Sequence, residues 1–260
     1  MLRYEYKYIV GYERLARLRA LLAPHMAVDA FAQLSGGEYT VRNIYFDTPA
    51  MDCYFQKING VKRRDKLRLR GYNDGGPDAP VFFEVKEKVD EPLRKHRASL
   101  RYDAAQAVLA GKSLDDVAIT PGRNGDAREQ ARMFMYKMHT RRMRPVVRVV
   151  YDREPFEEIF PDPDNDLRVT FDKNLRSAPL PQPDALFAES VMEPVMSGNF
   201  ILEIKFNQRM PAWIATLVKS LGLTRESASK YAMCIEAHPE ITAGIDTRAA
   251  IQSMDSPPAV

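Results

Sequence analysis

The sequence predicts an α+β protein built on antiparallel strands that carry charged residues on one face and apolar residues on the other. Charged and apolar residues alternate along several short segments, which is the period of a β-strand. Amphipathic segments with helical spacing separate these strands or follow them. The chain has 260 residues, of which 45% are hydrophobic and 28% charged, an ordinary balance for one large globular domain.

The elements follow from this alternation and from the turn residues between them. The expected strands span residues 3–10, 39–47, 62–72, 81–89, 93–100, 145–153, 167–172 and 199–206. The expected helices span residues 12–22, 51–58, 103–110, 126–139, 211–221 and 224–237. Residues 177–194 contain several prolines and read as irregular. One domain is expected over residues 1–242, followed by a small, polar and disordered tail over 243–260.

Lys, Arg and Glu dominate the polar face of these strands. Lys66, Arg68 and Arg70 alternate with leucines in the third strand. The same pattern places charged residues together on other strands: Glu5 with Lys7, Glu84 with Lys86 and Lys88, Glu203 with Lys205, and Arg168 with Asp172.

Alternation alone allows two interpretations of this face. A solvated face is common in antiparallel sheets. However, such a face can mix Ser, Thr, Gln and Asn with its charges, whereas these faces are mostly Arg, Lys and Glu. If helices cover the apolar face, the charged faces point into a wet lumen, and a linear chain of phosphates is the natural anion to compensate the bases. The few glutamates could hold a divalent metal through oxygen ligands.

Composition and motifs exclude several classes of protein. The net charge of +3 is too small to imply nucleic-acid binding by itself. Cys53 and Cys234 form no disulfide framework, and together with the lack of a signal peptide or a long apolar stretch they favour the cytoplasm. Neither GxxxxGK[ST] nor GxGxxG occurs, so a nucleotide would bind through strand side chains.

Several segments resemble the triphosphate tunnel (CYTH) superfamily, and the later ones resemble its VTC domain, the polyphosphate polymerase domain, in the free-standing prokaryotic form. The segments run in the family's order from residue 3 to about residue 236: Glu5 to Lys7, Leu67 to Tyr72, Phe83 to Lys88, Arg144 to Arg153, Leu167 to Asp172, Ile201 to Lys205, and Ser229 to Tyr231. The resemblance implies a closed antiparallel β-barrel, the triphosphate tunnel fold, with surrounding helices.

The resemblance also implies a set of site residues. Arg68, Arg70, Lys86, Arg168 and Glu203 would be catalytic; Lys7, Lys95, Tyr151, Arg153, Ser229 and Lys230 would bind phosphate; Glu203 and Glu5 would hold Mn²⁺ or Mg²⁺. Ser229 and Lys230 would act from the start of the last helix, which Ser227 can cap. Ser227 stands where eukaryotic VTC domains usually have a basic residue, so the resemblance implies one phosphate contact fewer in this chain.

The activity that the resemblance implies is transfer of the ATP γ-phosphate to a growing polyphosphate chain, with a metal ion as cofactor. The partners would be ATP and inorganic polyphosphate or triphosphate, with no nucleic acid. Two alternatives stay open: a triphosphatase that hydrolyses inorganic or nucleoside triphosphate, and a module that binds polyphosphate without turnover.

Overall fold

The computed structural model of the chain describes residues 3–88, 94–121, 126–188 and 191–245. Its α-helices are α1 (Leu15–Leu22), α2 (Ala30–Gln33), α3 (Asp52–Ile58), α4 (Tyr102–Leu109), α5 (Ala127–Thr140), α6 (Ala212–Ser220) and α7 (Lys230–Glu236). Its strands are β1 (Tyr4–Gly11), β2 (Met26–Val28), β3 (Tyr39–Asp47), β4 (Arg64–Tyr72), β5 (Pro80–Lys88), β6 (Arg94–Arg101), β7 (Ile119–Thr120), β8 (Arg144–Glu158), β9 (Arg168–Pro179), β10 (Glu193–Pro194) and β11 (Asn199–Phe206). Four 3₁₀ turns are also described: η1 (Tyr12–Arg14), η2 (Leu114–Asp116), η3 (Pro183–Ala185) and η4 (Pro239–Ile241).

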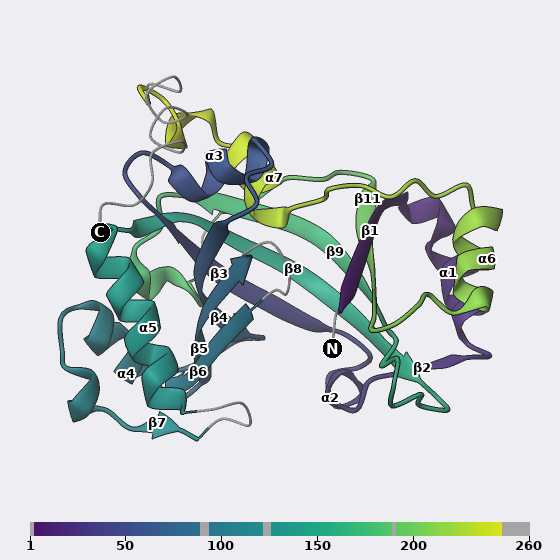
Figure 1. Cartoon of the computed structure of the whole chain (residues 1–260), viewed down its shortest axis with the longest axis horizontal. Helices are drawn as coiled ribbons and strands as arrows, with labels where there is room; N and C mark the ends of the chain where they lie inside the picture. Colours follow the sequence, from purple (N-terminus) through teal and green to yellow (C-terminus); the bar gives the residue numbers. More distant parts are fainter. Residues whose placement is uncertain (1–2, 89–93, 122–125, 189–190, 246–260) are drawn as a thin grey trace. The chain divides into compact units, whose positions relative to one another are not determined.

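The fold is mixed α+β with a large antiparallel sheet (Figure 1). Its strand order is β1-β11-β9-β8-β3-β4-β5-β6-β7, with β2 paired to β8 and β10 to β9. In the described part of the chain this order ends at β1 and β7, so the sheet is not closed, and the expected closed barrel is corrected. Alternation reports which face of a strand is buried, but it holds no information on whether the two edges of a sheet meet.

The chain divides into two compact units, each made of three segments. Unit 1 comprises Met1–Val41, Val150–Arg176 and Pro194–Ser229, and unit 2 comprises Arg42–Val149, Ser177–Glu193 and Lys230–Val260. The expectation of one domain over residues 1–242 stays a prediction. The expected tail lies mostly outside the described residues, which end at 245.

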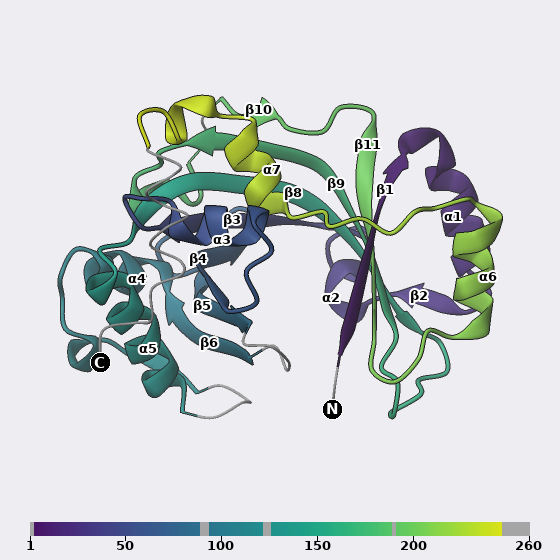
Figure 2. The ribbon, with the colours of Figure 1, turned by 45° about the horizontal axis from the view of Figure 1, so that its top comes forward.

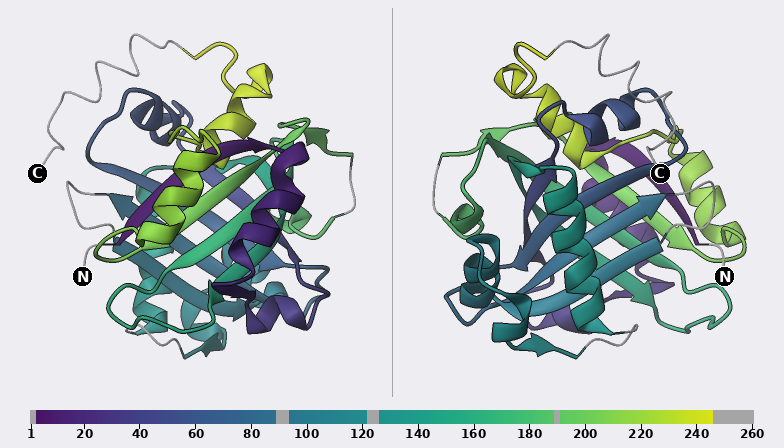
Figure 3. Two further views of the ribbon diagram at one scale, coloured as in Figure 1. Left: turned by 90° about the vertical axis from the view of Figure 1, so that its right-hand side faces the viewer. Right: turned by 60° about the vertical axis from the view of Figure 1, so that its left-hand side comes forward.

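In unit 1 two helices cover the apolar face of β1, β11 and β9. Leu18 and Leu22 of α1 and Ile214 and Leu217 of α6 are buried in one core with the strands. The strand residues of that core are Tyr8, Val10, Val169, Phe171, Phe200, Leu202, Ile204 and Phe206. Figure 3 (left) shows α1 in purple and α6 in yellow-green lying across these strands. The opposite, charged face of the strands therefore lies on the side away from the helices.

In unit 2 helix α5 covers the apolar face of the β4–β5–β6 meander (Figure 3, right). Phe134 of α5 is fully buried and stacks on Phe83 of β5, with the ring centroids 4.4 Å apart. Leu67, Leu69, Val85, Ala98 and Leu100 lie on the same side and are buried. Asp126 caps α5 by accepting a hydrogen bond from the Arg128 backbone N–H. The sequence correctly predicted a helix-covered apolar face in both units.

The last helix is shorter than the sequence predicts. It was expected from residue 224, but α7 begins at Lys230, so Ser227 lies outside it and is not its cap. Residues 223–229 form no helix. No helix in residues 3–88, 94–121, 126–188 or 191–245 is long and apolar enough to cross a membrane.

Candidate functional site

Basic side chains form rows across β4, β5 and β6 on the face away from α5. The register places Lys66, Lys86 and Lys95 opposite one another, and Arg68, Glu84 and Arg97 in the next row. Arg70 follows in the row after that, opposite Phe82. We call this surface the basic face of unit 2; its members are Lys66, Arg68, Arg70, Glu84, Lys86, Lys95 and Arg97.

Glu84 is the centre of this face, and its side chain is only 2% exposed. The Arg68 Nη2 atom lies 2.6 Å from its Oε2 atom, and the Lys95 Nζ atom lies 3.0 Å from its Oε1 atom. The Nε atoms of Arg97 and Arg70 lie 3.4 Å and 3.6 Å from the carboxylate. Burial alone would raise the pKa of Glu84, but these four cations hold it well below its ordinary value. Glu84 is therefore ionised at neutral pH.

Strand β3 and neighbouring residues hold the arginines in fixed directions. The Tyr45 hydroxyl accepts a hydrogen bond from Arg68 Nη1 at 2.9 Å, and the Asn43 side-chain oxygen accepts one from Arg70 Nε at 2.9 Å. The Arg97 guanidinium lies 3.7 Å from the centroid of the Phe82 ring. Because these partners fix the guanidinium planes, the forks are oriented before any ligand binds.

The pKa values of Tyr45, Tyr72 and Lys95 are shifted in the direction that neighbouring positive charges cause. Burial would raise the pKa of Tyr45, yet the charges of Arg68, Arg70 and Lys230 lower it on balance. Burial would likewise raise the pKa of Tyr72, which Arg70 and Arg97 lower. The pKa of Lys95 is lowered by burial and by its basic neighbours despite the ion pair with Glu84. Placing several bases close together is costly unless negative charge lies nearby, and Glu84 supplies part of that charge here.

The charged face of unit 1 has a different balance. We define it as Glu5, Lys7, Arg153, Arg168, Asp172, Glu203 and Lys205, which the register of β1, β11 and β9 and the side chain of Arg153 on β8 bring together. Lys7 Nζ lies 2.7 Å from Glu5 and 3.7 Å from Glu203, and Lys205 also pairs with Glu203. Arg153 donates two hydrogen bonds to Asp172, at 2.6 and 2.8 Å. Acids and bases are paired here, so this face carries little surplus charge.

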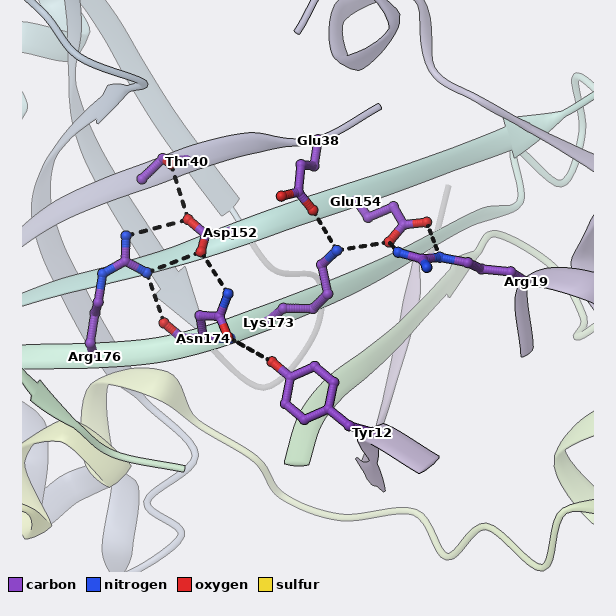
Figure 4. Close-up of polar contacts among 9 residues, drawn as sticks. All are labelled: Tyr12, Arg19, Glu38, Thr40, Asp152, Glu154, Lys173, Asn174 and Arg176. Atoms are coloured by element: carbon purple, nitrogen blue, oxygen red, sulfur yellow. Dashed lines mark hydrogen bonds and ion pairs between the residues drawn. The ribbon is translucent and has the colours of Figure 1, made fainter. Parts of the chain in front are cut away.

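A second network in unit 1 joins β8 and β9 on the side of β8 opposite to Arg153 (Figure 4). Lys173 pairs with Glu154 at 2.9 Å and with Glu38, and Arg19 donates two hydrogen bonds to Glu154. Asp152 accepts hydrogen bonds from Thr40, Asn174 and Arg176. Asp152 and Glu154 flank Arg153 in β8, and Lys173 follows Asp172 in β9. The network therefore holds together the two strands that carry the Arg153–Asp172 ion pair.

The predicted site residues fall in both units. Unit 2 holds Arg68, Arg70, Lys86, Lys95 and Lys230, and unit 1 holds Glu5, Lys7, Tyr151, Arg153, Arg168, Glu203 and Ser229. Arg153 lies over the Tyr151 ring, 5.4 Å from its centroid. The Arg168 side chain is 55% exposed and pairs with Asp166. Their roles as ligands and catalysts stay predictions.

Sequence reasoning missed part of both faces. Arg97 alternates with Lys95, so the strand period could have found it. Lys66 and Lys205 were expected on the charged faces but were not named as site residues. Tyr45 and Asn43 gave no such signal, because β3 is buried on both faces and its pattern does not show which side meets the arginines.

Glu5 and Glu203 supply carboxylate oxygens of the kind that Mg²⁺ and Mn²⁺ prefer. They lie on neighbouring strands, and Lys7 contacts both. No group of three or more His, Cys, Asp or Glu residues suited to a metal occurs within the described ranges. Mg²⁺ is commonly held by one or two carboxylates together with substrate phosphates, so this pair fits a metal that arrives with its substrate.

The position of Glu84 makes stability depend on pH. Its pKa in the folded protein is well below the ordinary value of 4.5, so its contribution to stability is present above that value and is lost as the pH falls through the folded pKa. We expect the difference in free energy of unfolding between wild type and Glu84→Gln to be constant above pH about 5 and to shrink below it. Urea unfolding of both proteins from pH 7 to pH 3 measures this. A difference that grows toward pH 3 would contradict it.

Comparisons with known proteins place the chain in a family. The proposed adenylyl cyclase HpAC1 from Hippeastrum, which shows a dominant triphosphatase activity, is 16% identical, with 91% of this chain and 96% of that chain covered and a TM-score of 0.48. A chain of the Mediator head module of Schizosaccharomyces pombe is 14% identical, with 85% and 92% covered and a TM-score of 0.36. Both likenesses are weak, and the family rests on the domain match alone. The family model of the VTC domain matches residues 2–238, and the chain therefore belongs to the VTC domain family.

Proposed function

We propose that the protein is a polyphosphate polymerase that transfers the γ-phosphate of ATP to a growing inorganic polyphosphate chain with Mn²⁺ or Mg²⁺ as cofactor. One observation carries the proposal: four bases on the basic face of unit 2, namely Arg68, Arg70, Lys95 and Arg97, converge on the buried carboxylate of Glu84. A chain of phosphates has the charge density and the length to meet bases on three neighbouring strands.

Phosphoryl transfer depends mainly on alignment and on neutralising charge, and this face supplies both. Arg68 and Arg70 present oriented forks that suit the oxygens of a reacting phosphate. Lys66, Lys86 and Lys95 present compact charges on flexible stems, which suit successive groups along a chain. The nucleophile is a terminal phosphate oxygen of the acceptor, so no side-chain nucleophile is needed.

Glu203 and Glu5 would hold the metal ion. A bound Mn²⁺ or Mg²⁺ supplies Lewis-acid charge to phosphate oxygens. Lys7 contacts both carboxylates and holds them on one face of β1 and β11. In the proposal Lys7, Tyr151, Arg153, Arg168, Ser229 and Lys230 add phosphate contacts; Arg153 does so while its fork stays on Asp172.

Incubation of the purified protein with ATP and Mn²⁺ tests the activity. We expect a ladder of polyphosphate on a urea gel, and we expect EDTA to abolish it because the phosphate charge is then no longer neutralised by a metal. The variant Glu203→Gln should need more Mn²⁺ for half-maximal rate. Release of inorganic phosphate without chain growth would favour the triphosphatase instead. Tight binding of tripolyphosphate without turnover would favour the binding module.

The burial of charged side chains on the basic face of unit 2 also indicates whether the protein could bind nucleic acid. A duplex binder shows its bases as an exposed stripe, and its affinity falls steeply with salt. Arg70 and Glu84 are buried instead, and Arg68 is held by Tyr45. We therefore expect no binding of duplex DNA in the salt range where tripolyphosphate binds. The cytoplasmic location stays a prediction.

A further inference from the structure

Asp47 ends strand β3 as a buried carboxylate with a full set of hydrogen bonds. Its Oδ1 atom accepts from the backbone N–H groups of Thr48 and Cys53, at 2.7 and 2.9 Å, and its Oδ2 atom accepts from that of Tyr54 at 3.0 Å. It therefore satisfies N–H groups at the start of α3, which begins at Asp52. This ties the start of α3 to the strand that carries Tyr45.

Tyr231 of α7 completes this arrangement. Its hydroxyl donates a hydrogen bond to Asp47 Oδ2, and both side chains are buried. Figure 2 shows α7 lying beside α3, which agrees with their contacts. The Tyr231 ring packs 5.0 Å from the Tyr45 ring, and Lys66 Nζ lies 5.5 Å from its centroid. Burial and the Asp47 charge hold the pKa of Tyr231 well above its ordinary value, so the phenol remains a donor.

Lys230 is the residue before Tyr231 and the first residue of α7. It is buried, and its charge acts on Tyr45, the partner of Arg68. Consecutive residues of a helix point in directions that differ by about 100°. Fixing the direction of Tyr231 therefore fixes that of Lys230.

We propose that Asp47 and Tyr231 are positioning residues that hold Lys230 at the start of α7, close to Tyr45, where it joins the basic face of unit 2 in binding phosphate. This inference rests on the proposed function. An apolar contact would be enough to dock a helix without burying a carboxylate, which is costly unless every partner is satisfied. A directed hydrogen bond adds what an apolar contact lacks, because it sets the rotation of α7 about its axis as well as its depth.

The far end of α7 provides a matched control. His238, two residues after the helix ends, lies with its Nε2 atom 2.8 Å from the Ser177 hydroxyl, and both residues are buried. The His238 contact lies beyond the end of α7 opposite Lys230, and Ser177 also contacts the Cys234 side chain in the second half of the helix. Ser177→Ala should therefore lower stability without changing the direction of Lys230.

Calorimetric titration with tripolyphosphate tests the inference as a double-mutant cycle. We expect Lys230→Ala to weaken binding about tenfold and Tyr231→Phe about threefold to fivefold. The double variant should bind no more weakly than Lys230→Ala, because Tyr231 acts through Lys230. Ser177→Ala should bind as wild type does. Wild-type affinity in Tyr231→Phe, or additive losses in the double variant, would overturn the inference.

A second measurement does not depend on phosphate binding. Tyrosine labelled with ¹³C at Cζ reports the ionisation of Tyr45 by NMR, with Tyr45→Phe identifying its signal. Because the Lys230 charge lowers the Tyr45 pKa, Lys230→Ala should raise it and Tyr231→Phe should raise it in the same direction. An unchanged Tyr45 titration in Tyr231→Phe would refute the positioning role. If wild type fails to bind tripolyphosphate, the proposed function falls, and the titration still decides the placement of Lys230.

Discussion

Replacing Glu84 with glutamine is expected to lower the free energy of unfolding by about 3 kcal/mol, because four cations lose their common counter-ion. Arg70 is buried, and its charge would stay in the protein interior without compensation. Arg68, Lys95 and Arg97 are partly exposed, so water screens some of their repulsion, and this places the cost at the lower end of the range for broken buried ion pairs. The amide keeps the shape of the side chain, so packing changes little.

Tripolyphosphate should restore much of this stability. The anion supplies the negative charge that the variant lacks, so it should raise the thermal midpoint of Glu84→Gln more than that of wild type. Glu87→Gln is the matched control, because Glu87 lies on the same strand but pairs with Lys137 and His96 on the other face. Thermal unfolding followed by circular dichroism measures all three proteins with and without tripolyphosphate. Equal shifts in Glu84→Gln and Glu87→Gln would argue against a basic face that is built for an anion.

Replacing Arg68 with alanine is expected to lower kcat/KM for polyphosphate formation by about 10²–10³-fold, the usual effect of removing one preorganised donor from a charged transition state. Arg68 contacts Glu84 and Tyr45 with different nitrogens, so its fork is held between two strands. Arg68→Lys keeps the charge but not the fork, and it should recover only part of the rate. The test is the steady-state rate of chain growth with ATP and Mn²⁺.

Arg101→Ala removes the same charge from β6 and serves as the control. Its guanidinium is exposed and pairs with Asp78 and Asp103 rather than with Glu84. We expect this variant to grow polyphosphate at the wild-type rate. If Arg68→Ala and Arg101→Ala lose activity equally, net charge rather than the oriented fork accounts for the effect.

The sequence was enough to predict which side chains of these strands are buried and which are not, because charged and apolar residues alternate along them. Leu67 and Leu69 are buried under α5 while Arg68 and Arg70 face away, and Glu203 and Lys205 face away from the core of unit 1. This is why most residues expected on the two charged faces lie there. The resemblance to the VTC domain, confirmed by the family match, added the order of the segments.

The rest depends on long-range contacts that periodicity does not encode. Closure of the sheet is one case, since it requires the edge strands β1 and β7 to pair. The direction of β3 is another: Asn43 and Tyr45 point toward Arg70 and Arg68, and only the fold reveals it. The start of α7 is a third, because the helix begins where Tyr231 reaches Asp47, later than its local sequence indicates.

The order of strands along the chain sets when each charged face can form during synthesis. The basic face of unit 2 is built from β4, β5 and β6, which follow one another directly and pair through local contacts. Local pairings form early, and proteins begin to fold from the N-terminal side as they leave the ribosome. By contrast, Glu5 lies on β1 and Glu203 on its neighbour β11, so the pair of carboxylates proposed to hold the metal comes together only after the last strand has emerged. A nascent chain that reaches into β8 would thus already carry the complete basic face of unit 2, while Glu5 and Glu203 would come together only near the end of synthesis.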